Sequence, residues 1–183
     1  MRRLSALATA ASKGDEGGYE SLVRTLWPNA YRVAWSILGE RGAAEDAAQA
    51  ACAAICAKLH TLSDVRAFPA WAYRIILSHA RDHRRSRSRL RQRETVGYDE
   101  ASTHATSDDP SVRLDLEAAI SRLPEPVRLA VELHYLVGLS SREVGTVLGI
   151  PAATVRFRLL VARRRLRPLL AEASSPVTPE VVV

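Results

Sequence analysis

The chain has 183 residues, a mass of 20.1 kDa and a formal net charge of +6. This length suits one domain or two small ones and excludes a large enzyme. No apolar run approaches the ~20 residues that cross a bilayer, and the charged residues Lys13, Asp15 and Glu16 come too early for a secretory signal. We therefore expect a cytoplasmic protein without membrane insertion, in which the two cysteines stay reduced.

The charge is distributed in blocks along the chain. Residues 19–93 carry +7, residues 94–112 carry −5 with no Lys or Arg, and residues 113–170 carry +5. The acidic stretch is poor in large apolar residues, which is typical of a flexible linker. The sequence therefore predicts an N-terminal extension (1–18), two small domains (19–93 and 113–170) joined by the acidic linker (94–112), and a disordered tail (171–183).

Helical spacing of apolar residues recurs in both domains and no segment alternates as a strand does, so the predicted fold class is all-α. In the first domain, Pro28 is expected to end one helix and begin the next, which stops at Gly39. A further helix is expected from Ala44 to Leu59. After a loop over residues 61–68, Pro69 is expected in the first turn of a third long helix.

That third helix carries a polar stripe. At about 100° per residue, four residues fall on one narrow side of it: Arg74, Ser78, Arg81 and Arg85. From Arg81 to Arg93, seven of thirteen positions are Arg, a density that suits phosphate contacts, although a solvated charged face has the same composition. Trp71 and Tyr73 fit core packing better than stacking on an unpaired base.

The second domain has the pattern of a helix-turn-helix, for which a plain helical hairpin is the alternative. Ser140 and Glu143 have the spacing of a capping box, Gly149 supplies the turn after this short helix, and Pro151 opens the next one. The N-terminal part of such a last helix reads base edges in the major groove, where an exposed Phe157 fits contact with a thymine methyl group. The candidate contact residues are Ala153, Thr154, Arg156, Phe157, Arg158, Leu160 and Arg164.

In their order and spacing these motifs resemble the extracytoplasmic-function (ECF, group IV) sigma factors, the smallest initiation factors of the bacterial sigma-70 family. The segment AEDAAQ (44–49) is similar to the family's acidic segment, and FPAWAYRI (68–75) with ARDHRR (80–85) is similar to its promoter-melting helix. LVGLS (136–140), VLGI (147–150) and TVRFRL (154–159) follow its terminal helix-turn-helix. The resemblance covers nearly all of residues 19–170 and implies a sigma region 2-like bundle followed by a region 4-like domain.

The resemblance also implies a function without catalysis, cofactor or metal. The chain would bind core RNA polymerase at the beta-prime clamp helices and the beta flap, with Asp46 and Gln49 in the contact, and direct it to promoter DNA. The recognition helix would bind the minus-thirty-five element, and an anti-sigma factor is a further candidate partner. A base-capturing loop and the polar stripe would bind the minus-ten element through Leu62, Ser63, Asp64, Arg74, Ser78, Arg81, Arg84 and Arg85.

Some positions depart from the family pattern. Ala50 replaces a usual acidic residue beside the polymerase contact, and Ser78 replaces a usual Asn in the melting helix. In the recognition helix, Phe157 stands in place of a small polar residue and Val161 in place of an Arg. The last two changes imply an unusual minus-thirty-five preference.

Two other functions would each explain part of the sequence. A helix-turn-helix regulator that acts without polymerase explains the second domain but leaves the Trp- and Arg-bearing helix without a role. A small nuclease needs clustered carboxylates for metal or a nucleophile beside a base, whereas the acidic pairs here are far apart in the sequence.

Two cysteines and a histidine have the spacing of residues on one side of a helix. Cys52, Cys56 and His60 lie at i, i+4 and i+8, so one helix side could offer them to a metal or a redox reaction. Core packing is favoured for the two cysteines, because they fall where the family has buried aromatic residues.

Overall fold

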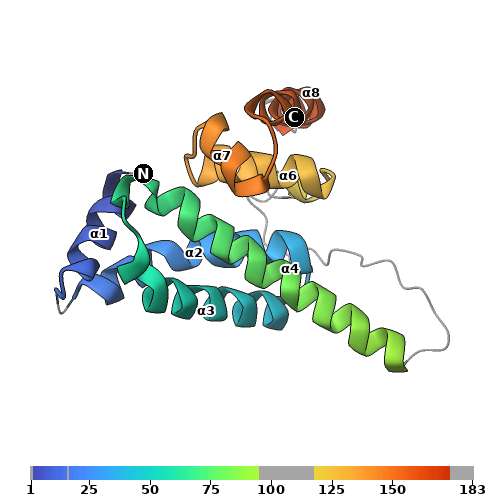
Figure 1. Ribbon diagram of the computed structural model, residues 1–183. Coiled ribbons are helices and arrows are strands. Elements are labelled where there is room, and N and C mark those ends of the chain that lie inside the picture. The colour runs from blue at the N-terminus through green and yellow to red at the C-terminus, as the bar shows by residue number, and fades with distance from the viewer. Residues whose placement is uncertain (1, 16, 95–117, 174–183) are drawn as a thin grey trace, which may run out of the picture.

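The computed structural model describes residues 2–15, 17–94 and 118–173, and every regular element in these ranges is helical (Figure 1). The all-α prediction is confirmed, whereas the predicted linker and tail fall almost wholly outside the described residues. The first group comprises α1 (Arg2–Ser12), α2 (Gly18–Leu38), α3 (Arg41–Lys58), two 3₁₀ turns (Leu59–Thr61 and Val65–Ala67) and α4 (Phe68–Glu94). The second comprises α6 (Glu125–Val131), a π-helical turn (Glu132–Leu136), α7 (Ser141–Leu148) and α8 (Ala152–Ala173).

The first group is a bundle in which α2, α3 and α4 all pack on one another. Small side chains form most of the buried face of α3, which lets its backbone lie close to both neighbours. That face consists of Ala43, Ala44, Ala47, Ala48, Ala51, Cys52 and Ile55. The larger fully buried side chains, Phe68, Tyr73 and Ile76 of α4 among them, fill the centre of the bundle.

Pro28 does not end a helix, so that prediction is wrong. The helix α2 continues through it without a break. Apolar residues before and after the proline, Leu22, Leu26, Ala30 and Val33, are all buried in the same core. Their burial holds both halves on one axis against the ~3 kcal/mol that an interior proline costs a helix.

The N-terminal extension is a helix that belongs to the bundle. Leu4, Ala8 and Ala11 of α1 are buried, and α1 packs against α2 and α4. The approach is close at the start of α2, where a Cβ on Gly18 would lie 2.7 Å from the backbone nitrogen of Ala11. Gly18 is therefore the residue that lets α1 fold back onto the bundle.

The second group contains the expected helix-turn-helix, α7 followed by α8. The Ser140 capping box is present, with the Ser140 amide donating to Glu143 Oε2 at 2.8 Å and the Glu143 amide donating to Ser140 Oγ at 3.3 Å. Gly149 ends α7 with φ +70°, a left-handed conformation that favours glycine. Within the described ranges no single helix is long and apolar enough to cross a membrane; α7 and α8 meet that test only as a pair, bent by 106° between Leu148 and Ala152.

A buried arginine joins the two groups. The Nε of Arg128 donates to Ser36 Oγ at 2.7 Å and its Nη2 to the Ser36 carbonyl at 2.6 Å, on α2. Its Nη1 donates to the carbonyls of Ser121 (2.8 Å) and Leu123 (3.0 Å) in its own group. Around this contact α6 packs against α2 and α7 against α4, as the stacking in Figure 1 shows, and the buried apolar residues form one cluster.

Glu132 lies one turn after Arg128 and is also buried. Burial raises the pKa of its carboxyl to about 7, although Arg128, Ser36 and Arg32 oppose the shift. Its Oε2 has no hydrogen-bond partner among the described residues. We call Ser36, Arg128 and Glu132 together the Arg128 junction.

The raised pKa of Glu132 predicts a pH-dependent stability. The carboxyl titrates at 4.5 when unfolded and at about 7 when folded, so the folded chain holds the extra proton between these values. The free energy of unfolding therefore falls as the pH rises from about 4.5 to about 7. The variant Glu132→Gln cannot ionise, and we expect it to lose this part of the slope and to gain up to about 3 kcal/mol at pH 8. Urea unfolding at pH 5 and pH 8 measures both quantities, and equal slopes in the two proteins would contradict the assignment.

Candidate nucleic-acid and polymerase interfaces

The helix α8 presents one buried and one exposed side. Its buried side is formed by Val155, Leu159, Ala162 and Leu166. On the other side Phe157 is 64% exposed and Leu160 is 41% exposed, an uncommon accessibility for large apolar residues on an arginine-rich helix. Ala153, Arg156 and Arg164 are exposed with them, and Thr154 is half-buried.

Arg158 is placed differently from the other predicted residues of this helix. It is half-buried, and its Nη1 lies 3.4 Å from the carbonyl of Pro126, at the start of α6. Its guanidinium thus faces the helix packed behind α8. The other six residues predicted to contact DNA lie on the accessible part of α8, whereas Arg158 points toward α6.

The angle between α7 and α8 depends on a glycine that the sequence analysis did not single out. A Cβ on Gly145 would lie 2.6 Å from the carbonyl oxygen of Ile150, in the turn between the helices. Ile150 also donates its amide to the Gly145 carbonyl at 3.0 Å. This close backbone contact holds the turn against α7, and the bend of 106° is in the range of helix-turn-helix motifs.

The polar stripe of α4 has the expected exposure. Arg74, Ser78 and Arg85 are exposed and Arg81 is half-buried. Asp82 lies among them and accepts hydrogen bonds from Ser78 Oγ and Arg85 Nη1, both at 3.3 Å. The carboxylate therefore orients two members of the stripe, and these surface contacts are weak enough for a phosphate to replace them.

Arg84, the remaining predicted contact on α4, is engaged by the other helical group. Its Nη1 lies 2.6 Å from Glu125 Oε2, at the first residue of α6, and both side chains are partly accessible. The structure thus places a predicted minus-ten residue at the interface between the two groups.

The three predicted residues of the loop before α4 lie in three different environments. Leu62 packs against the core. Asp64 accepts from the Arg66 amide at 2.9 Å and pairs with its Nε at 3.1 Å, which holds the pKa of the Asp64 carboxyl below its usual value. Ser63 is exposed between them. The loop is therefore anchored on both sides of one accessible residue.

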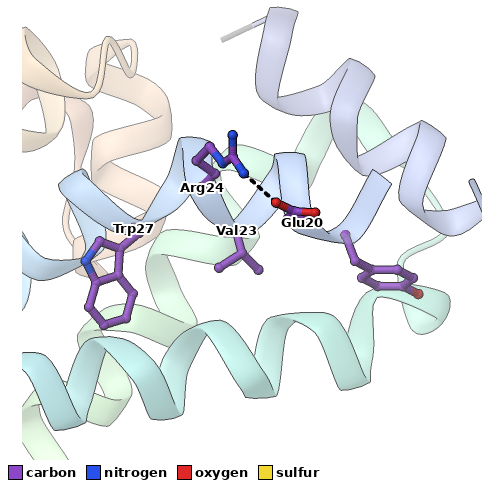
Figure 2. A pocket seen from close by; sticks show the side chains of 5 residues that line it. Glu20, Val23, Arg24 and Trp27 are labelled. Atoms are coloured by element: carbon purple, nitrogen blue, oxygen red, sulfur yellow. Dashed lines mark hydrogen bonds and ion pairs between the residues drawn. The ribbon is translucent and has the colours of Figure 1, made fainter. Parts of the chain in front are cut away.

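The predicted polymerase contacts lie on the outer side of α3. Asp46 and Gln49 are exposed three residues apart, so they share one helix face. On α2, a hollow is lined by Tyr19, Glu20, Val23, Arg24 and Trp27. Figure 2 shows Val23 and Trp27 on the side of α2 toward α3, with the Glu20–Arg24 ion pair beside them. The hollow is mainly apolar, and its lining residues hold no nucleophile beside a base.

The structure confirms core packing for Cys52, whereas Cys56 lies at the edge of the bundle. Cys52 is buried and Cys56 half-buried. Burial, with a smaller contribution from Cys56, raises the pKa of the Cys52 thiol to about 11, and burial also raises the pKa of Cys56. Both thiols are protonated at neutral pH, the form that neither attacks disulfides nor binds metal. Among the described residues, no three His, Cys, Asp or Glu side chains are grouped as a metal site.

The two aromatic residues at the start of α4 pack in or against the hydrophobic core. Tyr73 is fully buried, and burial raises the pKa of its hydroxyl. Trp71 is half-buried with its ring centroid 5.9 Å from that of Phe68. Core packing is therefore confirmed for Tyr73, and Trp71 keeps an accessible edge.

Two family descriptions match the chain. Residues 22–90 match sigma-70 region 2, and residues 113–166 match sigma-70 region 4. The first covers α2 through most of α4, and the second covers the helix-turn-helix with the helix before it.

Named relatives agree with both matches. The RNA polymerase sigma-H factor of Pseudomonas aeruginosa is 30% identical over 91% of this chain and 95% of its own length. The ECF RNA polymerase sigma factor SigE of Mycolicibacterium smegmatis is 31% identical over 88% of this chain, which spans 66% of SigE. SigW of Bacillus subtilis, also an ECF RNA polymerase sigma factor, is 27% identical over 87% of this chain and 92% of its own length.

Solved structures show the same fold. CnrH, in complex with the cytosolic domain of CnrY, superposes with a TM-score of 0.62 at 24% identity, covering 92% of this chain and 97% of CnrH. The sigma factor RpoE, in complex with the anti-sigma factor NepR from Bartonella quintana, gives 0.64 at 23% identity, covering 85% of this chain and 98% of RpoE.

The contact at Gly145 predicts the effect of a single methyl group. Helix propensity alone favours Gly145→Ala by ~1 kcal/mol, but the new Cβ would meet a backbone oxygen that cannot move aside. We expect the collision to prevail and to lower the free energy of unfolding by about 2 kcal/mol. Gly17→Ala is the matched control, because a Cβ there meets nothing within 4 Å. Urea unfolding compares the two variants, and an unchanged Gly145→Ala protein would show that the turn is looser than described.

Proposed function

The chain belongs to the extracytoplasmic-function sigma factors of the sigma-70 family, and we propose that it uses the α2–α4 bundle and the α7–α8 helix-turn-helix to bring core RNA polymerase to its promoters. The observation that supports this division is the order of the two sigma-70 regions, each on its own helical group with an exposed arginine-bearing face. The relatives are transcription initiation factors, and we propose that this chain likewise acts in the cytoplasm without catalysing a reaction.

We propose that α4 and the loop before it bind the minus-ten element. Arg74, Ser78 and Arg85 give an exposed polar track along the helix, suited to the phosphates of a separating strand. Ser63, exposed in an anchored loop, is the residue best placed to contact a base that has left the stack. Arg84 is available to the DNA only when its pair with Glu125 is broken.

We propose that α8 binds the minus-thirty-five element in the major groove. Arg156 and Arg164 supply positive charge on its exposed side, suited to guanine edges and phosphates. Between them Phe157 and Leu160 form an apolar ridge, whose natural partners in a major groove are thymine methyl groups. The element should therefore combine guanine with at least one thymine.

We propose that polymerase binds the side of the bundle that carries Asp46 and Gln49. Their exposure on one face of α3 supports this assignment. The hollow on α2, whose Val23 and Trp27 lie on the side toward α3, supports it too, since apolar surface flanked by polar groups is typical of protein interfaces. An anti-sigma factor is the second protein partner that we propose, supported by the RpoE–NepR complex among the similar structures.

Transcription by the reconstituted holoenzyme tests the function. Core RNA polymerase with this chain should start transcripts at a defined set of promoters on bacterial genomic DNA, and polymerase alone should not. We expect Asp46→Ala to weaken binding to core polymerase by about tenfold while leaving binding to minus-thirty-five duplex unchanged. Asp15→Ala, an exposed acid in the turn between α1 and α2, is the matched control.

The opposite result identifies the rival function. A chain that binds duplex promoter tightly by itself and never directs core polymerase would be a helix-turn-helix regulator. In that case Asp46→Ala and Asp15→Ala would behave alike in every assay.

The contact of Phe157 with thymine can be tested one methyl group at a time. Replacing a thymidine of the minus-thirty-five element by deoxyuridine removes the methyl and keeps every hydrogen bond. We expect one such position to weaken binding about fivefold for the wild type and to have no effect on Phe157→Ala, because one buried methyl is worth about 1 kcal/mol. Leu160→Ala, altered at the other position of the ridge, should keep the fivefold effect at the thymine that Phe157 contacts, which shows that the loss in Phe157→Ala is specific to that side chain. If deoxyuridine weakened the binding of the wild type and of Phe157→Ala equally at every thymine position, Phe157 would not contact a thymine methyl group.

A further inference from the structure

We propose that the exposed side of α8 recognises the C5-methyl group of a pyrimidine whichever base carries it, so that C5-methylated cytosine in the minus-thirty-five element is bound as thymine is. The inference rests on the proposed function, because it needs α8 to lie in the major groove of that element. It deepens that function by naming a modified base as a second ligand of the same surface.

The apolar ridge of α8 has the geometry to contact base edges. At about 100° per residue, four exposed residues fall within about 60° of one another on the helix: Ala153, Phe157, Leu160 and Arg164. The helix lies on the side of its group away from the bundle, which leaves this stripe open (Figure 1). Three residues rise about 4.5 Å along a helix, close to the ~3.4 Å of one base step, so Phe157 and Leu160 are spaced for neighbouring base pairs.

The side chains of α8 include no carboxylate or amide over most of its length. In the major groove, Asp or Glu accepts from the cytosine amino group, and Asn or Gln recognises adenine. None of these four residue types occurs from Ala152 to Ala171, and the one hydroxyl group of this segment belongs to the half-buried Thr154. Phe157 and Leu160 therefore contact bases through apolar surface alone, and hydrogen bonds to bases come chiefly from the arginines.

An apolar side chain cannot distinguish thymine from C5-methylcytosine. Both bases carry the same methyl group on C5, which projects into the major groove. They differ at position 4, where thymine has a carbonyl oxygen and cytosine an amino group. That difference is recognised by hydrogen bonds, which Phe157 cannot make. Phe157 should therefore bind thymine and C5-methylcytosine alike, and both more tightly than uracil and unmodified cytosine.

A methylated cytosine also keeps the base that the arginines of α8 recognise. C5-methylcytosine pairs with guanine, whose O6 and N7 accept hydrogen bonds from arginine, whereas thymine pairs with adenine. Arg156 and Arg164 are exposed on the same helix as Phe157. Methylation thus adds an apolar contact at a G·C pair without removing a guanine contact. Modification of a single promoter cytosine would thereby raise initiation from that promoter.

Binding of the full chain to four minus-thirty-five duplexes tests the proposal. The duplexes are identical except at the thymine position where deoxyuridine weakens wild-type binding most. That position carries thymine, uracil, cytosine or C5-methylcytosine, each with its complement opposite. The measurement gives two affinity ratios, thymine over uracil and C5-methylcytosine over cytosine. Each ratio compares two duplexes that differ by one methyl group and keep every hydrogen bond.

We expect both ratios to be about five for the wild type and about one for Phe157→Ala. Leu160→Ala is the matched control, because it shortens the same ridge at another base pair and should keep both ratios. Arg163→Met, exposed on α8 outside the ridge, should weaken binding to all four duplexes together and leave the ratios unchanged. Holoenzyme at limiting concentration should start about fivefold more transcripts from the methylated cytosine promoter than from the unmethylated one.

Two results would overturn the proposal. One is a preference for thymine over uracil without a preference for C5-methylcytosine over cytosine, which would leave the thymine contact intact. The other is a methyl preference of equal size in the wild type and Phe157→Ala, because the methyl group would then act through another side chain or through the shape of the DNA. The binding arm needs no polymerase. A chain that shows both ratios but never directs polymerase would therefore refute the initiation function and leave methyl recognition demonstrated.

Discussion

The burial of one guanidinium group determines how the two halves of this molecule meet. Arg128 cannot be deprotonated, so it lies inside the protein only where acceptors surround it. The chain supplies them from both sides: carbonyls at Ser121 and Leu123 in its own group, and the hydroxyl and carbonyl of Ser36 in the other. These directed bonds set the position of α6 on α2, and with it the place of α7 on α4 and the outward position of α8 (Figure 1).

The junction is specific without being strongly stabilising. Glu132, the nearest buried carboxyl, offers Arg128 a negative charge one turn away, yet burial raises its pKa to about 7, so near neutral pH the pair is only partly ionised. The apolar cluster around it supplies most of the attraction, and the polar groups select one orientation.

Local chemistry allowed much of the fold and of the candidate site to be predicted from the sequence. The capping box at Ser140, the left-handed Gly149 and the helical spacing of α8 depend on residues a few positions apart, and the structure confirms each. Pro28 was misjudged because its local preference to end a helix gives way to the burial of Leu22 and Ala30 on either side. The burial of α1 was missed for a similar reason, since only contact with the bundle distinguishes its apolar residues from those of a frayed end.

Net charge is where local inference fails most clearly. The arginines of residues 113–170 were counted together as a DNA-binding charge, but Arg128 lies inside the protein and Arg158 faces the carbonyl of Pro126. Nothing in the neighbouring sequence distinguishes Arg128 from an exposed arginine, because its acceptor Ser36 is 92 residues away. The arginines of this domain thus divide between exposed positions on α8, which we propose for DNA binding, and a buried position on α6 that joins the helical groups. We therefore expect a substitution of an exposed arginine on α8 to change promoter affinity, and a substitution of Arg128 to change the packing of the two groups.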